Sequence, residues 1–170
     1  MASGTRSKIY KAEGLVLSRK DLGDTDRIVT LYTREFGRRR LVARSARRPN
    51  SQFAPHIELF TRVRIVGVTG KNLDVLTQAQ TIETYPQLRD NLTAYAAAGW
   101  AIELIDGLSI DGEAVPSAYA AVTDFLKILS DAQNSPEPLL SAVTLRLLDI
   151  HGYGPELTMC TLCAAHIEAG

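Results

Sequence analysis

The first half of the chain alternates apolar and polar residues with the period of two that is typical of β-strands. In the third of these stretches, for example, Arg40 and Val42 point to the face opposite Leu41. Each stretch is rich in β-branched residues and is bounded by glycine, proline or aspartate. The stretches that we expect to form strands are 9–18, 27–33, 38–44, 58–68 and 73–83.

The spacing of these five stretches favours a small closed barrel. We expect a turn at 21–24 and a hairpin turn between Gly67 and Gly70, and we expect Gly14 to mark a bulge in the first strand. Closing a five-stranded sheet removes the unpaired edges that an open sheet would expose. An OB-type barrel fits this number of strands. An SH3-like barrel also fits, because the number of strands alone does not separate the two.

From Pro86 onward the apolar positions recur at helical spacing. Three helices are expected, over 91–107, 117–131 and 139–151, and Asn91 is expected to cap the first of them. Gly152 and Pro155 end the third. The fold class is therefore α+β with the strands first: an OB-type barrel over 1–84 and an all-helical domain over 85–170. The residues expected to be buried by the second helix are Tyr119, Val122, Phe125, Leu126 and Leu129.

Charge divides the chain in the same way as the hydrophobic pattern does. Residues 1–71 contain 16 Lys and Arg against 6 Asp and Glu, whereas residues 72–170 contain 3 against 13, so the net charge of zero conceals a basic half and an acidic half. A basic half raises the local concentration of polyanions, whereas an acidic half repels them. The alternative is a charge pattern that serves solubility alone.

Arginine is concentrated between residues 34 and 48, where it occupies seven of fifteen positions. Mutual repulsion makes such a cluster unfavourable unless a polyanion relieves it, and the planar guanidinium group suits phosphate oxygens. The aromatic residues Tyr32, Phe36 and Phe53 lie nearby in sequence and are candidates for stacking on bases. A solvated basic face is the alternative. The predicted nucleic-acid-binding residues are Arg34, Arg38, Arg39, Arg40, Arg44, Arg47, Arg48, Arg62, Arg64 and Lys71.

Two further patterns have a metal or phosphate interpretation. Asp21, Asp24 and Asp26 supply three carboxylates, but their spacing lacks the distal glutamate of a calcium-binding EF-hand loop, so we interpret them as part of a turn. The stretch 67–72 resembles a phosphate-binding loop superficially. It has one residue too few between its glycines, and Asn72 stands where a hydroxyl is required, so a hairpin turn is the better interpretation.

Cys160 and Cys163 have the spacing of half a zinc knuckle. His166 is a candidate third ligand, and no fourth Cys or His follows it in this sequence. Three interpretations stay open: an interrupted zinc site, two unbound thiols, and a redox pair. Redox chemistry is disfavoured because the motif follows a helix and a Gly-Tyr-Gly-Pro segment instead of a strand.

The sequence contains no motif of a known catalytic class: no Gly-x-Ser-x-Gly, no His-Glu-x-x-His and no dinucleotide fingerprint. We therefore expect a protein that is not an enzyme. No stretch reaches the roughly 20 apolar residues that span a bilayer, and residues 1–8 are polar, unlike a secretory signal. The expectation is a cytoplasmic protein with no membrane partner.

Several segments in order along the chain resemble the bacterial RecO family of recombination mediators. They include 13–19 (EGLVLSR), 23–34 (GDTDRIVTLYTR), the basic loop 43–51 (ARSARRPNS) and the C-terminal 152–163 with its Gly-Tyr-Gly-Pro and Cys-Thr-Leu-Cys motifs. The family's basic loop usually has lysine-glycine where this chain has Arg44 and Ser45. Zinc-containing members carry a second Cys-x-x-Cys and further helices, so we expect this chain to be a fragment or a truncated product.

The resemblance implies a mediator of recombinational DNA repair that binds single- and double-stranded DNA and anneals complementary strands. The implied partners are RecR, the single-stranded-DNA-binding protein and, indirectly, the recombinase RecA, which places the protein at the nucleoid. It implies no nucleotide cofactor, and zinc only in a complete chain. Three other classes remain open: an RNA-binding OB protein, a protein-interaction scaffold with a basic docking face, and a metal-dependent nuclease that uses Asp21, Asp24 and Asp26.

Overall fold

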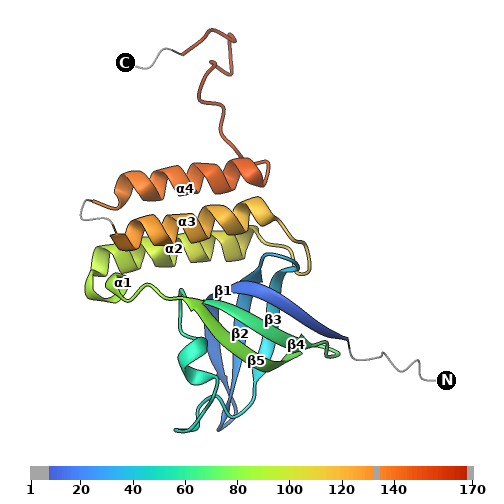
Figure 1. Cartoon of the computed structure of the whole chain (residues 1–170). Helices are drawn as coiled ribbons and strands as arrows, with labels where there is room; N and C mark the ends of the chain where they lie inside the picture. The colour runs from blue at the N-terminus through green and yellow to red at the C-terminus, as the bar shows by residue number, and fades with distance from the viewer. Residues whose placement is uncertain (1–7, 132–134, 168–170) are drawn as a thin grey trace, which may run out of the picture.

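A computed structural model describes residues 8–131 and 135–167, so most of the polar N-terminal stretch lies outside the described residues. The strands expected from the sequence are confirmed, with shifted bounds, and they close into a barrel (Figure 1). The hydrogen-bonded order around the barrel is β1-β2-β3-β5-β4. The strands are β1 (Ile9–Leu22), β2 (Asp26–Thr33), β3 (Gly37–Ala43), β4 (Arg62–Val68) and β5 (Asp74–Glu83).

Strand β1 closes the barrel because it pairs with two neighbours. Its first half, from Ile9 to Leu15, pairs with β4, and its second half pairs with β2. The register with β2 shifts between Val16 and Ser18, so the predicted bulge lies beyond Gly14 and not at it. A parallel contact between β3 and β5 completes the ring. This strand order is that of an OB-type barrel, and it decides between the two barrel types that fitted the sequence.

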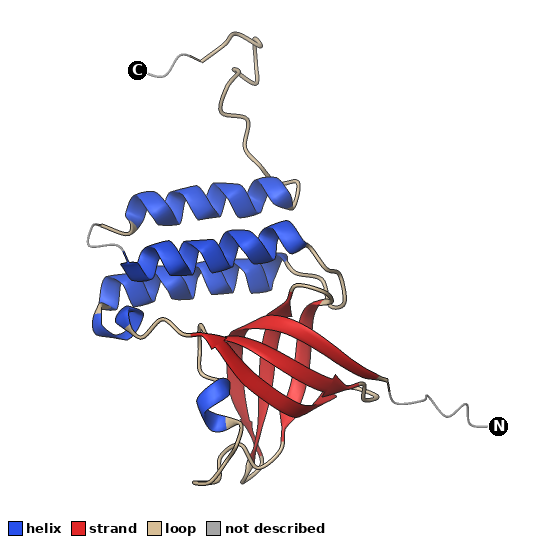
Figure 2. Cartoon of the chain, in the orientation of Figure 1, coloured by secondary structure: helices blue, strands red, loops and turns tan. Residues whose placement is uncertain are grey.

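The α-helices follow the barrel in the chain and lie against one end of it, whereas the short helix η1 lies between β3 and β4 in the chain and beside the barrel (Figure 2). Asn91 caps α2 as predicted, because its side-chain oxygen accepts hydrogen bonds from the backbone N–H groups of Thr93 at 3.0 Å and Ala94 at 3.1 Å. Two short elements were not predicted, since one turn of helix gives no periodic signal. The helices are η1 (Ala54–His56), α1 (Gln87–Asp90), α2 (Leu92–Leu108), α3 (Pro116–Asp131) and α4 (Glu137–Ile150).

Apolar side chains form two cores. One fills the barrel and includes Val29, Leu41 and Ile65. The other is built by α2, α3 and α4, and it contains every side chain that the sequence assigned to the buried stripe of α3. Leu15 and Tyr32 of the barrel belong to this second core. The barrel and the helices therefore bury apolar surface against each other, which fixes how the two units are joined. Within the described residues, none of the helices is both long and apolar enough to cross a membrane.

Candidate nucleic-acid interface

The predicted nucleic-acid-binding residues do not form a single patch. Strand β3 runs from Gly37, beside the helices, to Ala43 at the opposite end of the barrel. At about 3.3 Å per residue, the strand separates Arg38 from Arg44 by roughly 20 Å. The arginine cluster therefore divides between the helical end of the barrel and the far end, which carries the loop 44–61. Arg34 and Lys71 are exposed on the β2–β3 and β4–β5 turns.

Exposed basic side chains line two adjoining hollows, one at the far end of the barrel and one along its side. A hollow of about 550 Å³ is lined by Arg44, Arg48 and residues 49–53. A second, of about 510 Å³, lies along the outer face of β4 and β5 and is lined by Lys11, Arg64 and His56, with polar side chains of β5. The two hollows share Gln52 and Phe53. In the described part of the chain, no carboxylate forms an ion pair with Arg44, Arg48 or Arg64.

Local hydrogen bonds hold the beginning of this loop. The carboxylate of Asp26 accepts from the backbone N–H of Ser45 at 2.8 Å, and this bond, together with one from Thr25, lowers the pKa of Asp26. Arg47 lies against the β1–β2 turn, where it donates to the carbonyl of Gly23 at 2.9 Å and pairs with Asp21 at 3.3 Å. Arg47 is thus less available to a ligand than Arg44 or Arg48.

These contacts also decide the interpretation of the aspartate cluster. Asp26 binds the loop after β3, whereas Asp21 pairs with Arg27 and Arg47. Across residues 8–131 and 135–167, no group of three or more His, Cys, Asp or Glu side chains is arranged to hold a metal ion. Asp24 lies in the β1–β2 turn, and Asp21 and Asp26 lie at the ends of the two strands that flank it.

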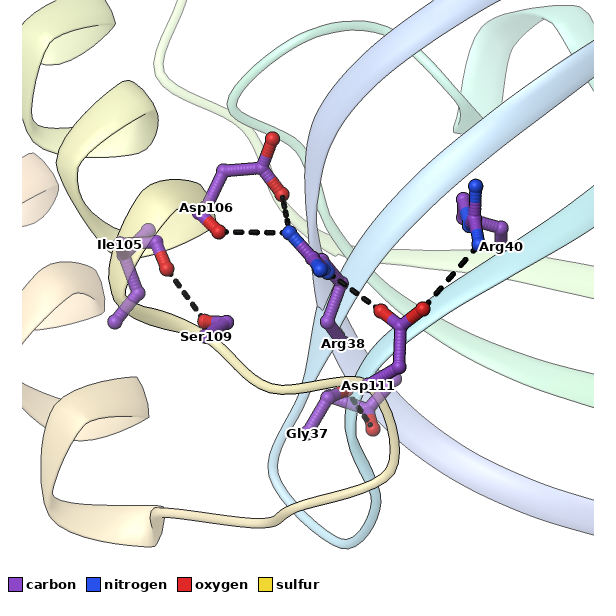
Figure 3. Close-up of polar contacts among 8 residues, drawn as sticks. Gly37, Arg38, Arg40, Ile105, Asp106, Ser109 and Asp111 are labelled. Carbon is purple, nitrogen blue, oxygen red and sulfur yellow. Dashed lines mark hydrogen bonds and ion pairs between the residues drawn. The ribbon is translucent and has the colours of Figure 1, made fainter.

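At the helical end, Asp106 in the last turn of α2 and Asp111 in the segment that follows engage two of the predicted arginines (Figure 3). Arg38 donates through Nε to Asp111 at 2.6 Å and through Nη1 to the backbone carbonyl of Asp106 at 2.8 Å. Arg40 pairs with the other oxygen of Asp111 at 3.2 Å. The hydrogen bond from Arg38 lowers the pKa of Asp111, so the carboxylate is ionised at neutral pH. Next to these pairs lies a hollow of about 410 Å³ whose lining includes Lys20, Arg38 and Arg40.

Two predicted arginines are engaged in contacts within the protein. Arg39 is half-buried, with its guanidinium 5.9 Å from the ring centre of Tyr10 and 5.6 Å from that of Phe36. Arg62 is also half-buried and forms ion pairs with Glu13, at 2.7 Å, and with Glu83. In both cases the Nε atom is buried and has no hydrogen-bond partner among the described residues. These two side chains support the barrel, and exposed phosphate contact is better assigned to their neighbours.

The prediction of aromatic stacking was wrong for two of its three residues. Tyr32 is 1% exposed and Phe53 is 7% exposed, so both belong to the cores. Phe36 is half-buried and packs on Arg39. The side chains that sequence reasoning missed are Lys11, Gln52, His56, Gln78 and Gln80, all of which line the second hollow. The alternation of Gln78 and Gln80 on β5 was a usable signal, because it places both on the same outer face as Arg64.

Cys160 and Cys163 lie on a tight turn near the C-terminus. The backbone N–H of Cys160 donates to Ala165 at 2.8 Å, and Ala164 donates back to the carbonyl of Cys160 at 2.8 Å. Backbone N–H groups of Cys163 and Leu162 lower the pKa of the Cys160 thiol. His166 does not join the two thiols as a third ligand, since the described residues contain no cluster of three metal-binding side chains. The residues therefore fit half of a four-ligand zinc site.

Comparison with known proteins accounts for both halves of the chain. The family described as "Recombination protein O N terminal" matches residues 7–85, and "Recombination protein O C terminal" matches residues 89–170. The junction between the two matches falls where β5 has ended and the helices begin. Together they cover nearly all of the sequence. The chain belongs to the RecO family.

Individual RecO proteins agree with this assignment. A DNA repair protein RecO from Symbiobacterium thermophilum is 37% identical over 157 residues, which cover 92% of this chain and 62% of that protein. Another from a Roseiflexus species is 37% identical over 160 residues, which cover 94% of this chain and 56% of the relative. One from Pelotomaculum thermopropionicum is 35% identical, with 92% and 60% covered. The chain thus spans about 56–62% of the length of these RecO relatives.

Proposed function

We propose that this chain is the nucleic-acid-binding part of a recombination mediator that acts in DNA repair without being an enzyme. The observation that carries the proposal is a pair of adjoining hollows on an OB-type barrel: one at its far end, lined by Arg44 and Arg48, and one along β4 and β5, lined by Arg64 and Lys11. OB barrels commonly bind single strands along a basic groove. Family membership, and relatives named DNA repair proteins, favour DNA as the ligand.

The contacts proposed are to phosphate oxygens, with little reading of bases. Arg44 and Arg48 line one hollow and have no carboxylate partner within the described structure, so they repel each other, and a bound polyanion relieves this repulsion. The hollow beside β5 adds the amides of Gln78 and Gln80, which are donors and acceptors for sugar and phosphate groups. Both single- and double-stranded DNA present such phosphates, so we propose that both bind.

Strand annealing follows physically from such a surface. Two single strands repel each other through their phosphates, and this repulsion opposes the first base pairs. A surface that neutralises phosphates of both strands lowers the repulsion and leaves the base edges free to pair. No bond is made or broken in the protein, and no nucleotide cofactor is required. In this proposal RecR and the single-stranded-DNA-binding protein are partners, RecA is loaded indirectly, and the protein works at the nucleoid in the cytoplasm.

Zinc enters the proposal only as a structural ion. Cys160 and Cys163 would hold it as thiolates, and a structural site requires two further ligands. We propose that zinc binds where those ligands are supplied. DNA binding by the barrel does not depend on it, since the two cysteines lie beyond α4 and both hollows are lined only by residues of the barrel and its loops.

The test is fluorescence anisotropy of a labelled single-stranded DNA oligonucleotide titrated with the protein over a series of salt concentrations. Binding should weaken with salt, with a log–log slope of about −0.7 for each phosphate contact. The double variant Arg44→Gln and Arg48→Gln should bind more weakly and should flatten the slope by about 1.4. Arg146→Gln on α4 is the control, because it removes the same kind of charge from an exposed position on the helices.

Each result has a definite meaning. An unchanged slope in the double variant would remove the far end of the barrel from the interface, and loss of binding in Arg146→Gln would move the interface to the helices. Tighter binding of a matched RNA strand would favour an RNA-binding protein, since a site that reads the 2′-hydroxyl prefers RNA. Absence of binding at low salt by folded protein would favour a scaffold whose basic face meets an acidic protein.

A further inference from the structure

The segment 109–115 joins α2 to α3 and lies against the β2–β3 hairpin of the barrel. The backbone N–H of Gly112 donates to the carbonyl of Arg38 at 3.4 Å, and Asp111 forms a parallel bridge with Arg38. The approach is close: a Cβ atom on Gly37 would lie 1.8 Å from the carbonyl oxygen of Glu113. The segment is therefore seated on the barrel by its backbone, which aims the Asp111 side chain at β3.

The carboxylate of Asp111 spans two arginines at once. One of its oxygens accepts from Arg38 at 2.6 Å and the other from Arg40 at 3.2 Å (Figure 3). Carboxylate and phosphate present equivalent oxygen acceptors to a guanidinium fork. Asp111 thus occupies the place that a backbone phosphate would take between these two side chains.

The surroundings of this pair suit a nucleic-acid phosphate. The adjacent hollow of about 410 Å³ is lined by three basic residues, Lys20, Arg38 and Arg40, and by one acidic residue, Asp106. Ser18 on β1 and Thr30 on β2 add hydroxyl groups to its wall. Among the carboxylates of the described chain, only those of Asp106 and Asp111 lie within ion-pair distance of Arg38 or Arg40. Removing Asp111 from its position would expose a cationic surface on the strands of the barrel.

The pair between Asp111 and Arg40 is weak enough to be exchanged. The side chain of Arg40 is 54% exposed and that of Asp111 is 51% exposed, so water screens their attraction. Arg38 is held more firmly, because its side chain is 27% exposed and it also binds Asp106. A competing anion is therefore expected to take Arg40 first, while Arg38 remains attached to α2.

We propose that Asp111 is an internal competitor for nucleic acid: its carboxylate occupies the Arg38–Arg40 position in the free protein, and a backbone phosphate displaces it on binding. The inference rests on the proposed function, and it adds a second phosphate-binding surface whose availability the helical domain controls. Binding at this surface removes the ion pairs of Asp111 and so loosens the hold on the 109–115 segment, whereas binding at the Arg44–Arg48 hollow leaves these ion pairs intact.

The test compares Asp111→Asn with Glu113→Gln in the anisotropy titration. Both changes remove one negative charge from the same segment, but Glu113 forms no ion pair within the described residues, so it controls for the general loss of negative charge. An exposed ion pair is worth a factor of about 1.5 to 5 in an equilibrium constant. Asp111→Asn should therefore tighten binding by about 1.5- to fivefold for each ion pair that it loses, relative to Glu113→Gln. In an Arg40→Gln background most of this gain should disappear.

Equal DNA affinities of Asp111→Asn and Glu113→Gln would refute the proposal that Asp111 competes with DNA. The proposed function would still be supported if the unaltered protein binds DNA. Failure of the unaltered protein to bind would instead refute the proposed function. If Asp111→Asn does not fold, hydrogen exchange of the unaltered protein tests whether DNA displaces Asp111. Amides of residues 109–115 should exchange faster when saturating DNA is present, and unchanged or slower exchange there would contradict the displacement.

Discussion

Arg62 on β4 donates through Nη2 to the carboxylate of Glu13 on β1 at 2.7 Å, and the hydroxyl of Tyr119 on α3 donates to the same oxygen at 3.1 Å. This three-membered contact joins two strands of the barrel to the helical domain. Glu83 on β5 binds the other terminal nitrogen of Arg62. An arginine that the sequence placed among the DNA contacts is therefore part of the junction between the two units.

We predict that Arg62→Gln lowers mainly the stability of the protein and that Arg64→Gln lowers mainly its affinity for DNA, although both residues lie on the same face of β4. Arg62→Gln leaves Glu13 and Glu83 half-buried without their cation, which should lower the free energy of unfolding by about 1–3 kcal/mol. Arg64 is exposed and lines a hollow, so Arg64→Gln should weaken DNA binding and leave stability within about 0.5 kcal/mol. Urea unfolding and anisotropy on the same samples measure both effects.

Each variant is a control for the other, since both remove one positive charge from the same face of β4. A loss of DNA affinity in Arg62→Gln as large as in Arg64→Gln, with stability unchanged, would return Arg62 to the interface. It would also mean that the ion pairs with Glu13 and Glu83 break in solution.

The same contact predicts how stability depends on pH. Burial on its own raises the pKa of Glu13, but the hydrogen bonds from Arg62 and Tyr119 outweigh it and lower the pKa. A carboxylate whose pKa is lower in the folded state stabilises the protein above its unfolded pKa of about 4.3, and this stabilisation is lost as the pH falls toward the folded value. Glu13→Gln should be less stable than the unaltered protein at pH 7, and the gap should close below about pH 4.

Thermal unfolding at intervals from pH 7 to pH 3 measures this gap. Asp26 and Asp111 also have lowered pKa values, so both proteins lose stability in acid, and only the difference between them reports on Glu13. A gap that stays constant with pH would show that Glu13 contributes packing and no charge.

Sequence reasoning located the strands and the main helices because their patterns are local. The stripe on α3 and the alternation around Arg62 and Val63 follow from side-chain periodicity alone. It could not predict which arginines form ion pairs within the protein. Arg38 is engaged by Asp111, which lies 73 residues away, and Arg62 is engaged by Glu13, which lies 49 residues away. Such pairs depend on how the barrel meets the helices, which no local pattern encodes.

The burial of Tyr32 and Phe53 has a similar explanation. Both were near the arginine cluster in sequence, but an aromatic residue on a strand faces either the core or solvent according to register. Tyr32 faces the helices, and Phe53 closes the barrel from the loop that follows β3. The separation of the basic cluster into two parts could have been predicted from the expected strand 38–44, because an extended segment holds Arg38 and Arg44 far apart.

The cap of α2 gives a local prediction about stability. Asn91→Ala removes the acceptor for the N–H groups of Thr93 and Ala94, which should cost about 1 kcal/mol. Asn91→Asp keeps an acceptor oxygen at this position and should restore most of the loss. Urea unfolding of both variants checks this, and equal destabilisation by alanine and aspartate would mean that the cap contributes little.

Gly37 and Gly23 offer a test of how tightly the 109–115 segment is seated. Both have positive φ angles, 62° and 58°, so alanine at either position costs about 1–2 kcal/mol from backbone strain alone. At Gly23 no heavy atom lies within 4 Å of an added Cβ, whereas at Gly37 the carbonyl oxygen of Glu113 lies 1.8 Å from it. Gly37→Ala must displace the segment, and overpacking of this kind adds about 1–3 kcal/mol. Gly37→Ala should therefore be the more destabilised of the two in urea.

The DNA-binding consequence follows from the same contact. Displacing the segment carries Asp111 away from Arg38 and Arg40, so folded Gly37→Ala should bind DNA more tightly than Gly23→Ala, in the direction expected for Asp111→Asn. The two glycine variants leave the net charge unchanged, which separates the effect of position from the effect of charge. Equal stability of the two variants would mean that the segment does not press on the hairpin. Equal DNA affinity with unequal stability would mean that Arg38 and Arg40 are not limiting for binding.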